Sequence, residues 1–295
     1  MAENITGLIL QGISGFYLVE AADTVMECRA RGLFRKEGIT PLAGDQVTVY
    51  CDGDSATITE ILPRRNSLIR PPVANVDVLA LVVSLAAPAP NLLILDRMIA
   101  VAEHKEIEPV IILNKTDLAD PVPLETLYRQ AGFPVYSVCA KTGSGVDLLQ
   151  SCLSGKVVVF TGNSGAGKSS LLNRMAPELN LATGDISRKL GRGRHTTRSA
   201  TLYHMPCGGY WADTPGFSSL DTTRAEPIRK EELAECFRDF TPYIGRCRYA
   251  SCTHTKEEGC AVREAVAEGK IAASRQENYA VMYEEAKQIR EWERG

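Results

Sequence analysis

The chain has 295 residues, of which 44% are hydrophobic and 23% charged, and its formal net charge is −3. This length allows two or three domains, and the composition is that of a folded globular protein rather than a disordered one. No apolar run reaches membrane-spanning length and no signal peptide opens the chain, so we expect a cytoplasmic protein with no membrane partner. The mildly acidic balance does not exclude nucleic-acid binding through local basic patches.

Residues 1–70 contain short strand-like stretches separated by Gly, Asp and Pro, which predicts a small β-barrel of the OB-fold type. The stretches are Gly7–Leu10, Phe16–Glu20, Val25–Arg29, Gln46–Tyr50 and Ala56–Ile61. A β-sandwich is the alternative. A basic cluster around Phe34, formed by Arg29, Arg31, Arg35 and Lys36, is either a nucleic-acid contact or an ordinary solvated face.

Arg70-Pro-Pro72 predicts a linker, because two prolines restrict the chain and end the preceding strand. Strand and helix patterns then alternate, which predicts an α/β domain. The strands are expected at Val76–Leu85, Val110–Leu113 and Val135–Val138, and the helices at Asp96–His104, Leu124–Ala131 and Gly145–Leu153. A strand pair is expected at Leu202–Met205 and Tyr210–Ala212.

From about Thr222 the sequence becomes charged and helical, with helices predicted at Glu231–Phe240, Val262–Glu268 and Ser274–Trp292. We therefore expect three domains, at residues 1–70, 71–222 and 223–295.

The stretch from Val157 to Leu172 has the pattern of a phosphate-binding loop, a P-loop. Apolar residues predict a buried parallel strand, and a helix restarts at Ser169. The glycines between them let backbone N–H groups converge on phosphate oxygens, Lys168 reaches the β- and γ-phosphates, and Ser169 offers a hydroxyl to Mg²⁺. Nucleotide contacts are thus expected from Gly162, Asn163, Ser164, Gly165, Ala166, Gly167, Lys168, Ser169 and Ser170. A plain glycine-rich turn is the alternative.

Asn114-Lys115-Thr116-Asp117 directly follows a predicted strand, which puts it at the carboxyl edge of the sheet beside the P-loop. Asp117 can accept hydrogen bonds from N1–H and the 2-amino group of guanine, whereas adenine offers no such pair. The Lys115 stem can lie over the base, and Asn114 can tie this loop to the P-loop. After the third strand, Cys139-Ala140 is expected to present a backbone N–H to guanine O6.

Asp213-Thr-Pro-Gly216 offers a carboxylate to water-mediated Mg²⁺ binding and a Gly216 N–H to the γ-phosphate. Between it and the P-loop, a threonine of the basic segment 188–198 can complete the Mg²⁺ shell, and we favour Thr197 over Thr196. Many GTPases carry a water-orienting glutamine just after this motif, but position 217 is Phe, so we assign that role to His195.

Cys247-x4-Cys252-x-His254-x5-Cys260 supplies three thiolates and one imidazole, a closed set that suits one structural Zn²⁺. A group of buried thiols is the alternative. His104 and His204 have no comparable neighbours in the sequence and are expected to be ordinary surface or core residues.

The motif set resembles that of translation-factor-type GTPases, but Asn114–Asp117 and the Ala140 loop precede the P-loop, as in a circular permutation. With the barrel and the cysteine cluster, the chain resembles the small ribosomal subunit biogenesis GTPase RsgA family, in which Cys139 occupies a position that is usually serine. The resemblance implies a monomeric GTPase that hydrolyses GTP to GDP, binds the small ribosomal subunit and its rRNA late in assembly, and is stimulated by it.

Two other functions stay open from the sequence. A nucleotide-gated RNA-binding module with incidental hydrolysis would share every motif, whereas a metabolic P-loop kinase would need an acceptor site that we do not recognise. Because Asp213–Gly216 is nearly the last element of the GTPase domain, loss of the γ-phosphate is expected to act directly on the C-terminal domain.

Overall fold

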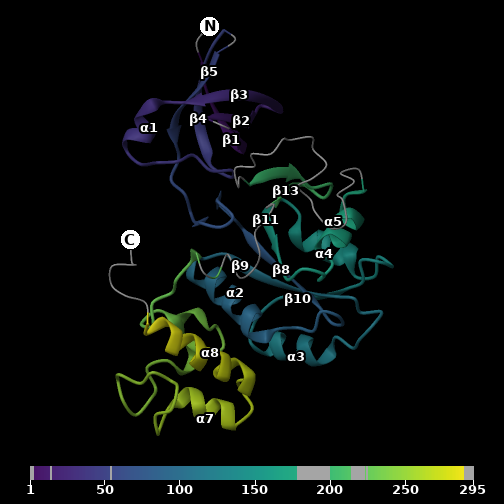
Figure 1. Ribbon diagram of the computed structural model, residues 1–295, viewed down its shortest axis with the longest axis vertical. Coiled ribbons are helices and arrows are strands. Elements are labelled where there is room, and N and C mark those ends of the chain that lie inside the picture. Colours follow the sequence, from purple (N-terminus) through teal and green to yellow (C-terminus); the bar gives the residue numbers. More distant parts are fainter. Residues whose placement is uncertain are drawn as a thin grey trace.

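The computed structural model describes residues 3–13, 15–53, 55–177, 200–213, 223 and 225–288. Its parts follow one another from the N-terminal barrel, through a central sheet with helices, to the C-terminal helices that lie below α2 (Figure 1). No helix in these ranges is long and apolar enough to cross a membrane.

The N-terminal strands close into the predicted barrel. The strands are β1 (Glu3–Ile13), β2 (Phe16–Ala21), β3 (Thr24–Ala30), β4 (Gln46–Asp52) and β5 (Ser55–Ile61). They pair in the order β1-β2-β3-β5-β4, β4 returns to β1, and β3 runs parallel to β5. This closed pairing confirms the barrel and excludes an open sandwich.

The barrel core contains Phe34, the aromatic residue at the centre of the basic cluster. Phe34, on the short helix α1 (Gly32–Lys36), is 9% exposed and packs with Ile9, Val47 and Ile58. The Phe34 ring is therefore not part of a surface contact formed by this basic cluster, because it lies in the barrel interior. Arg29 instead lies over the half-exposed ring of Phe16, with its guanidinium carbon 5.1 Å from the ring centroid.

The Arg70-Pro-Pro72 segment is the turn of a small hairpin rather than an extended linker. The strands β6 (Ser67–Leu68) and β7 (Val73–Ala74) pair on either side of it. The hairpin packs on the barrel edge, where Ala74 N–H donates to the Ala43 carbonyl at 2.8 Å.

The central sheet has the strand order β10-β9-β8-β11-β13-β12, and all its strands are parallel except β12. The strands are β8 (Val78–Ser84), β9 (Glu108–Asn114), β10 (Val135–Val138), β11 (Lys156–Thr161), β12 (Thr201–His204) and β13 (Gly209–Asp213). The helices are α2 (Leu92–His104), α3 (Val122–Gln130), α4 (Val146–Leu153) and α5 (Lys168–Met175).

Alternate residues of each buried strand enter two cores, one on each face of the sheet. Along β8, Leu79 and Leu81 face the core with α2, and Val78 and Val82 face the core with α4 and α5. Burial on both faces explains why the sequence shows continuous apolar runs here instead of alternation.

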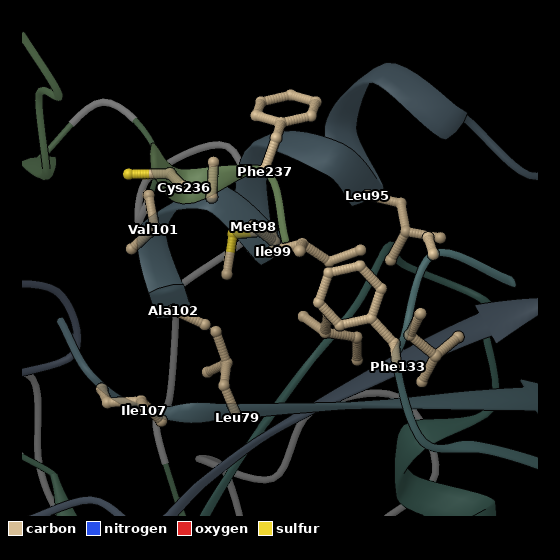
Figure 2. Close-up of a cluster of buried hydrophobic side chains, with 14 of the residues drawn as sticks. Leu79, Leu95, Met98, Ile99, Val101, Ala102, Ile107, Phe133, Cys236 and Phe237 are labelled. Atoms are coloured by element: carbon tan, nitrogen blue, oxygen red, sulfur yellow. The ribbon is translucent and has the colours of Figure 1, made fainter. Parts of the chain in front are cut away.

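The C-terminal segment shares the core on the α2 face instead of forming one of its own. Its elements are the 3₁₀ turns η2 (Leu233–Cys236) and η3 (Thr241–Tyr243) and the helices α7 (Ala261–Ala267) and α8 (Ala273–Ala286). Figure 2 shows Leu79 of β8, Met98 of α2 and Phe237 of the C-terminal segment in this one cluster.

The prediction of one continuous helix over Glu231–Phe240 was wrong. Only η2 is helical, and Phe237 is extended, with φ −110° and ψ 95°. Phe237 and Phe240 are still buried together, with ring centroids 5.0 Å apart, so the apolar spacing reflects burial without a continuous helix. Asp239, between them, pairs with the Arg275 guanidinium at 2.8 Å.

Candidate functional site

The carboxyl ends of the parallel strands bring the predicted motifs to one edge of the sheet. The segment Asn114–Asp117 begins at the end of β9, Cys139-Ala140 follows β10, and the glycine loop follows β11. The backbone of Asp213 ends β13 at the same edge, beside β11. This edge is where ligands bind in open parallel sheets.

Two glycines of the P-loop are required by close backbone approaches. A methyl group on Gly162 would lie 2.2 Å from the Val82 carbonyl oxygen, and one on Gly167 would lie 2.2 Å from Asn114 Nδ2. Gly165 has φ +79° at the exposed apex of the loop. The glycine spacing thus fits the loop between β8 on one side and the β9 loop on the other.

Lys168 begins α5 and turns back over the P-loop. Its ammonium donates to the Gly162 carbonyl at 2.5 Å and to the Asn163 carbonyl at 3.4 Å. Burial lowers the pKa of this amine. Its partners among the described residues are neutral carbonyls, and an anionic oxygen in their place would favour the charged form of the amine.

Asn114 joins three loops through one side chain that is 2% exposed. Its Nδ2 donates to the Ala166 carbonyl of the P-loop at 3.0 Å, which confirms the predicted tie. Its Oδ1 accepts from the Ala140 N–H at 3.1 Å. The N–H that was expected to face guanine O6 is therefore engaged by Asn114 in this structure.

The rest of the Asn114–Asp117 segment points outward from this buried residue. Thr116 N–H donates to the Val138 carbonyl at 3.3 Å, which holds the two predicted base-binding loops together. The Asp117 side chain is exposed, and Lys115 is half-buried. Cys139 is 2% exposed, and its N–H donates to the Ser144 carbonyl at 2.9 Å.

The predicted zinc ligands lie between η3 and α7 in the C-terminal segment. The ligand atoms of Cys247, Cys252, His254 and Cys260 all lie within 4.8 Å of one another. Nδ1 of His254 faces the sulfurs and is 3.5 Å from Sγ of both Cys247 and Cys260. Three sulfurs and one ring nitrogen at this separation form a donor set that is compatible with zinc.

Polar contacts around the cluster fix the loop that carries it. Tyr279 on α8 donates to the Thr253 carbonyl at 2.9 Å, and Gln276 donates to the His254 carbonyl at 3.1 Å. Burial acts to raise the pKa of the Glu257 carboxyl, but hydrogen bonds from Thr253 and from backbone N–H groups lower it to about 2. The loop is thus ordered from α8 and from its own carboxylate.

Comparison with known proteins agrees with this arrangement of motifs. A family model described as RsgA GTPase matches residues 61–223, and one described as RsgA N-terminal domain matches residues 6–58. The chain belongs to the RsgA GTPase family.

Its similarity to relatives in this family extends over nearly the full length. A protein of Caldanaerobacter subterraneus subsp. tengcongensis named small ribosomal subunit biogenesis GTPase RsgA is 46% identical over 290 residues, covering 97% of each chain. A protein of the same name from Moorella thermoacetica is 47% identical over 276 residues, covering 92% of this chain and 94% of that one.

Two solved structures share the whole RsgA architecture. YjeQ from Thermotoga maritima superposes with a TM-score of 0.82 at 34% identity, covering 98% of this chain and 100% of that one. YloQ, described as a circularly permuted GTPase, gives 0.79 at 36% identity, covering 98% and 97%. The permuted motif order predicted from the sequence is confirmed, and the chain is a GTP-hydrolysing enzyme of this family.

The predicted catalytic residues are only partly within the described ranges. Lys168 is described fully, and Asp213 is described in its backbone position at the end of β13. The described ranges do not include the remaining predicted residues of this step, which are His195, Thr196, Thr197, Gly216 and Phe217. The side chain of Asp213 also lies outside them. Their roles rest on the sequence.

Sequence reasoning missed the loop between β8 and α2, residues 84–91. The Ala87 carbonyl accepts from Lys115 Nζ at 2.5 Å, and a methyl group on Gly165 would lie 3.3 Å from Pro88 Cδ. With Met98 and Asn163, this loop lines a mainly apolar cavity of about 30 Å³. Only the position of this loop in the sequence could have predicted its role. It follows a buried strand, at the same edge of the sheet as the other motifs.

Proposed function

We propose that this RsgA-family GTPase acts on the small ribosomal subunit late in its assembly, in the cytoplasm and as a monomer, and that the subunit stimulates hydrolysis through rRNA contacts. The names of full-length relatives support the partner. Nucleotide binding is supported above all by the contacts of the Asn114 side chain. It binds the P-loop at Ala166 and the predicted base-binding loop at Ala140.

Guanine recognition is assigned to the Asn114–Asp117 segment and the loop at Ala140. The exposed Asp117 carboxylate can accept from the N1–H and 2-amino groups. Backbone N–H groups from Gly162 to Ser170 and the Lys168 ammonium hold the phosphates.

The hydrolytic step is assigned to residues that converge on the γ-phosphate. Ser169 and Thr197 are the proposed direct ligands of Mg²⁺, and Asp213 binds it through water. Mg²⁺, when bound, neutralises charge that develops on the phosphate oxygens. Gly216 donates its N–H to the γ-phosphate, and His195 orients the attacking water, because Phe217 has no polar atom for that role.

Cys247, Cys252, His254 and Cys260 are assigned to one structural Zn²⁺. The four donors fill a tetrahedral shell and leave no position for substrate, so the ion would stabilise the C-terminal fold rather than take part in hydrolysis.

A pull-down from separated ribosomal subunits tests the proposed partner. The chain loaded with a non-hydrolysable GTP analogue is expected to retain small subunits, and the GDP-loaded chain is expected to retain fewer. Retention of large subunits alone, or of neither subunit, would contradict the proposal. Equal retention with both nucleotides, without stimulated turnover, would favour a passive RNA-binding module.

A further inference from the structure

The ammonium of Lys115 is fixed between two loops by two backbone carbonyls. It donates to the Ala87 carbonyl at 2.5 Å and to the Gly165 carbonyl of the P-loop at 2.7 Å. Lys115 also has a left-handed backbone, with φ +70°. A lysine side chain has several rotatable bonds, so holding its end fixes the path of the stem that is proposed to lie along the guanine.

The Ala87 carbonyl is itself held in place by Ser84, the last residue of β8. Ser84 is 3% exposed, and its hydroxyl donates to the Ala87 carbonyl at 3.3 Å. The same hydroxyl accepts from the Ala86 N–H at 3.3 Å. The side chain therefore closes a local turn, in the way that short hydroxyl residues organise loops.

A third contact attaches this turn to the base-binding strand. Leu85 N–H donates to the Asn114 carbonyl at 3.0 Å, so the turn and Lys115 have a common support. A carbonyl oxygen has two lone pairs, and that of Ala87 uses them for Ser84 and for Lys115. The Ser84 hydroxyl therefore helps to hold this carbonyl in the orientation in which it also accepts from Lys115.

We propose that Ser84 is a positioning residue of the guanine-nucleotide site, which acts through the Ala87 carbonyl on the Lys115 ammonium. The inference rests on the assignment of Lys115 to the guanine site. Ser84 places an acceptor opposite the P-loop carbonyl of Gly165, so that contacts within the protein order Lys115. Nucleotide binding then does not have to order this side chain, which favours affinity for GDP and GTP alike.

The test is a double-mutant cycle between Ser84→Ala and Lys115→Met, read as dissociation constants for GDP and for a non-hydrolysable GTP analogue without ribosomes. We expect Ser84→Ala alone to weaken both nucleotides roughly 3- to 10-fold, the loss of one hydrogen bond. In the Lys115→Met background the same change should cost less than about 2-fold, because its target is gone. In steady-state turnover, Ser84→Ala should raise KM for GTP more than it lowers kcat.

Ser137→Ala is the matched control, since this half-buried hydroxyl near the end of β10 donates to Glu125 at 2.8 Å and not to the Ala87 turn. Its affinity for both nucleotides should stay at the parent value. Equal losses from Ser84→Ala in both backgrounds, or no loss in either, would overturn the inference while leaving the guanine assignment intact. If Lys115→Met alone binds guanine nucleotides like the parent, the assignment fails, and the inference fails with it.

Discussion

Three residues of one short segment, Asn114, Lys115 and Asp117, have different surroundings and different proposed roles. Asn114 is buried and holds loops together, Lys115 is half-buried between two carbonyls, and Asp117 is exposed at the edge. A change at Asn114 would therefore disturb several loops at once, whereas a change at Asp117 would alter only what the site accepts.

Asp117→Asn is expected to change base preference without unfolding the domain. The amide NH₂ would face two donors of guanine, so GTP affinity should fall at least about 10-fold. Xanthosine triphosphate has an oxygen in place of the 2-amino group and should therefore bind better than it does to the parent. Competition binding measures this. Asp120→Asn, an exposed residue that caps the start of α3, is the control, and an unchanged preference for GTP in Asp117→Asn would refute the assignment.

His195→Ala is expected to lower kcat about 10-fold or more with little change in GTP affinity, because position 217 leaves the water-orienting role open. His204→Ala is the control, since His204 pairs with Glu20 of the barrel at 2.8 Å. Steady-state turnover with small ribosomal subunits measures both variants. If His195→Ala turns over at the parent rate, His195 has no catalytic role.

At the scale of elements, the contact between α2 and α8 unites the GTPase and C-terminal segments. Arg275 of α8 is 1% exposed and lies between Asp96 of α2, at 2.7 Å, and Asp239, at 2.8 Å. Its guanidinium carbon also lies 4.5 Å from the ring centroid of Phe237. Removal of any one of these three charged partners would leave buried charge uncompensated and would destabilise the protein. This network therefore keeps the two segments in one arrangement.

Arg275→Met is expected to destabilise the protein by about 3 kcal/mol or more, because it leaves two buried carboxylates without their cation. Arg97→Met is the control: Arg97 and Glu285 join the same two helices at 2.5 Å, but the side chains are 21% and 57% exposed. An exposed pair should contribute at most about 1 kcal/mol. Urea unfolding midpoints compare the two, and equal shifts would contradict the importance of the buried network.

Cys252→Ser is expected to abolish zinc binding and to make residues 225–288 sensitive to protease, since the metal would close the loop that α8 supports. Elemental analysis and limited proteolysis measure the two effects. Cys51→Ser, a half-buried thiol in the barrel, should keep both the metal and the protease resistance. A parent chain without zinc, or a Cys252→Ser variant that resists protease like the parent, would rule out the structural site.

The same elements show what the sequence can and cannot predict. Strands β8, β9 and β11 were predicted within a few residues, because burial on both faces makes continuous apolar runs. The segment at Phe237 was not, because its helical spacing reflects burial in a shared core. The Ala87 contact left no signature, since a carbonyl binds Lys115 whatever the side chain, and only the folded chain brings the two together.

In the whole molecule, the two flanking parts are attached to the GTPase domain in different ways. The C-terminal segment shares its core, whereas the barrel meets the sheet at the pair Gln11 and Thr201 and through Glu20, which accepts from Tyr210 and contacts His204. After the Asp213–Gly216 motif, Glu226 binds Lys105, the residue that follows α2, at 2.9 Å. Glu226 also accepts from the Ile69 N–H on the hairpin turn at 2.5 Å. The beginning of the C-terminal segment is therefore attached to the end of α2 and to the hairpin beside the barrel.

This arrangement suits an enzyme that an RNA surface activates. The segment 188–198 carries five basic residues and no acid, and it contains both His195 and Thr197. Phosphate contacts with this segment would place both residues at the nucleotide. Because such contacts release counterions, stimulation should fall steeply as salt rises from about 50 to 200 mM, more steeply than GTP binding does.

The most direct measurement is GTP turnover with small ribosomal subunits, with large subunits and with neither, across that salt series. The account predicts stimulation by small subunits alone, lost as salt rises while the nucleotide stays bound. Equal turnover in all three mixtures would contradict it, and stimulation by large subunits alone would move the site of action to the other half of the ribosome.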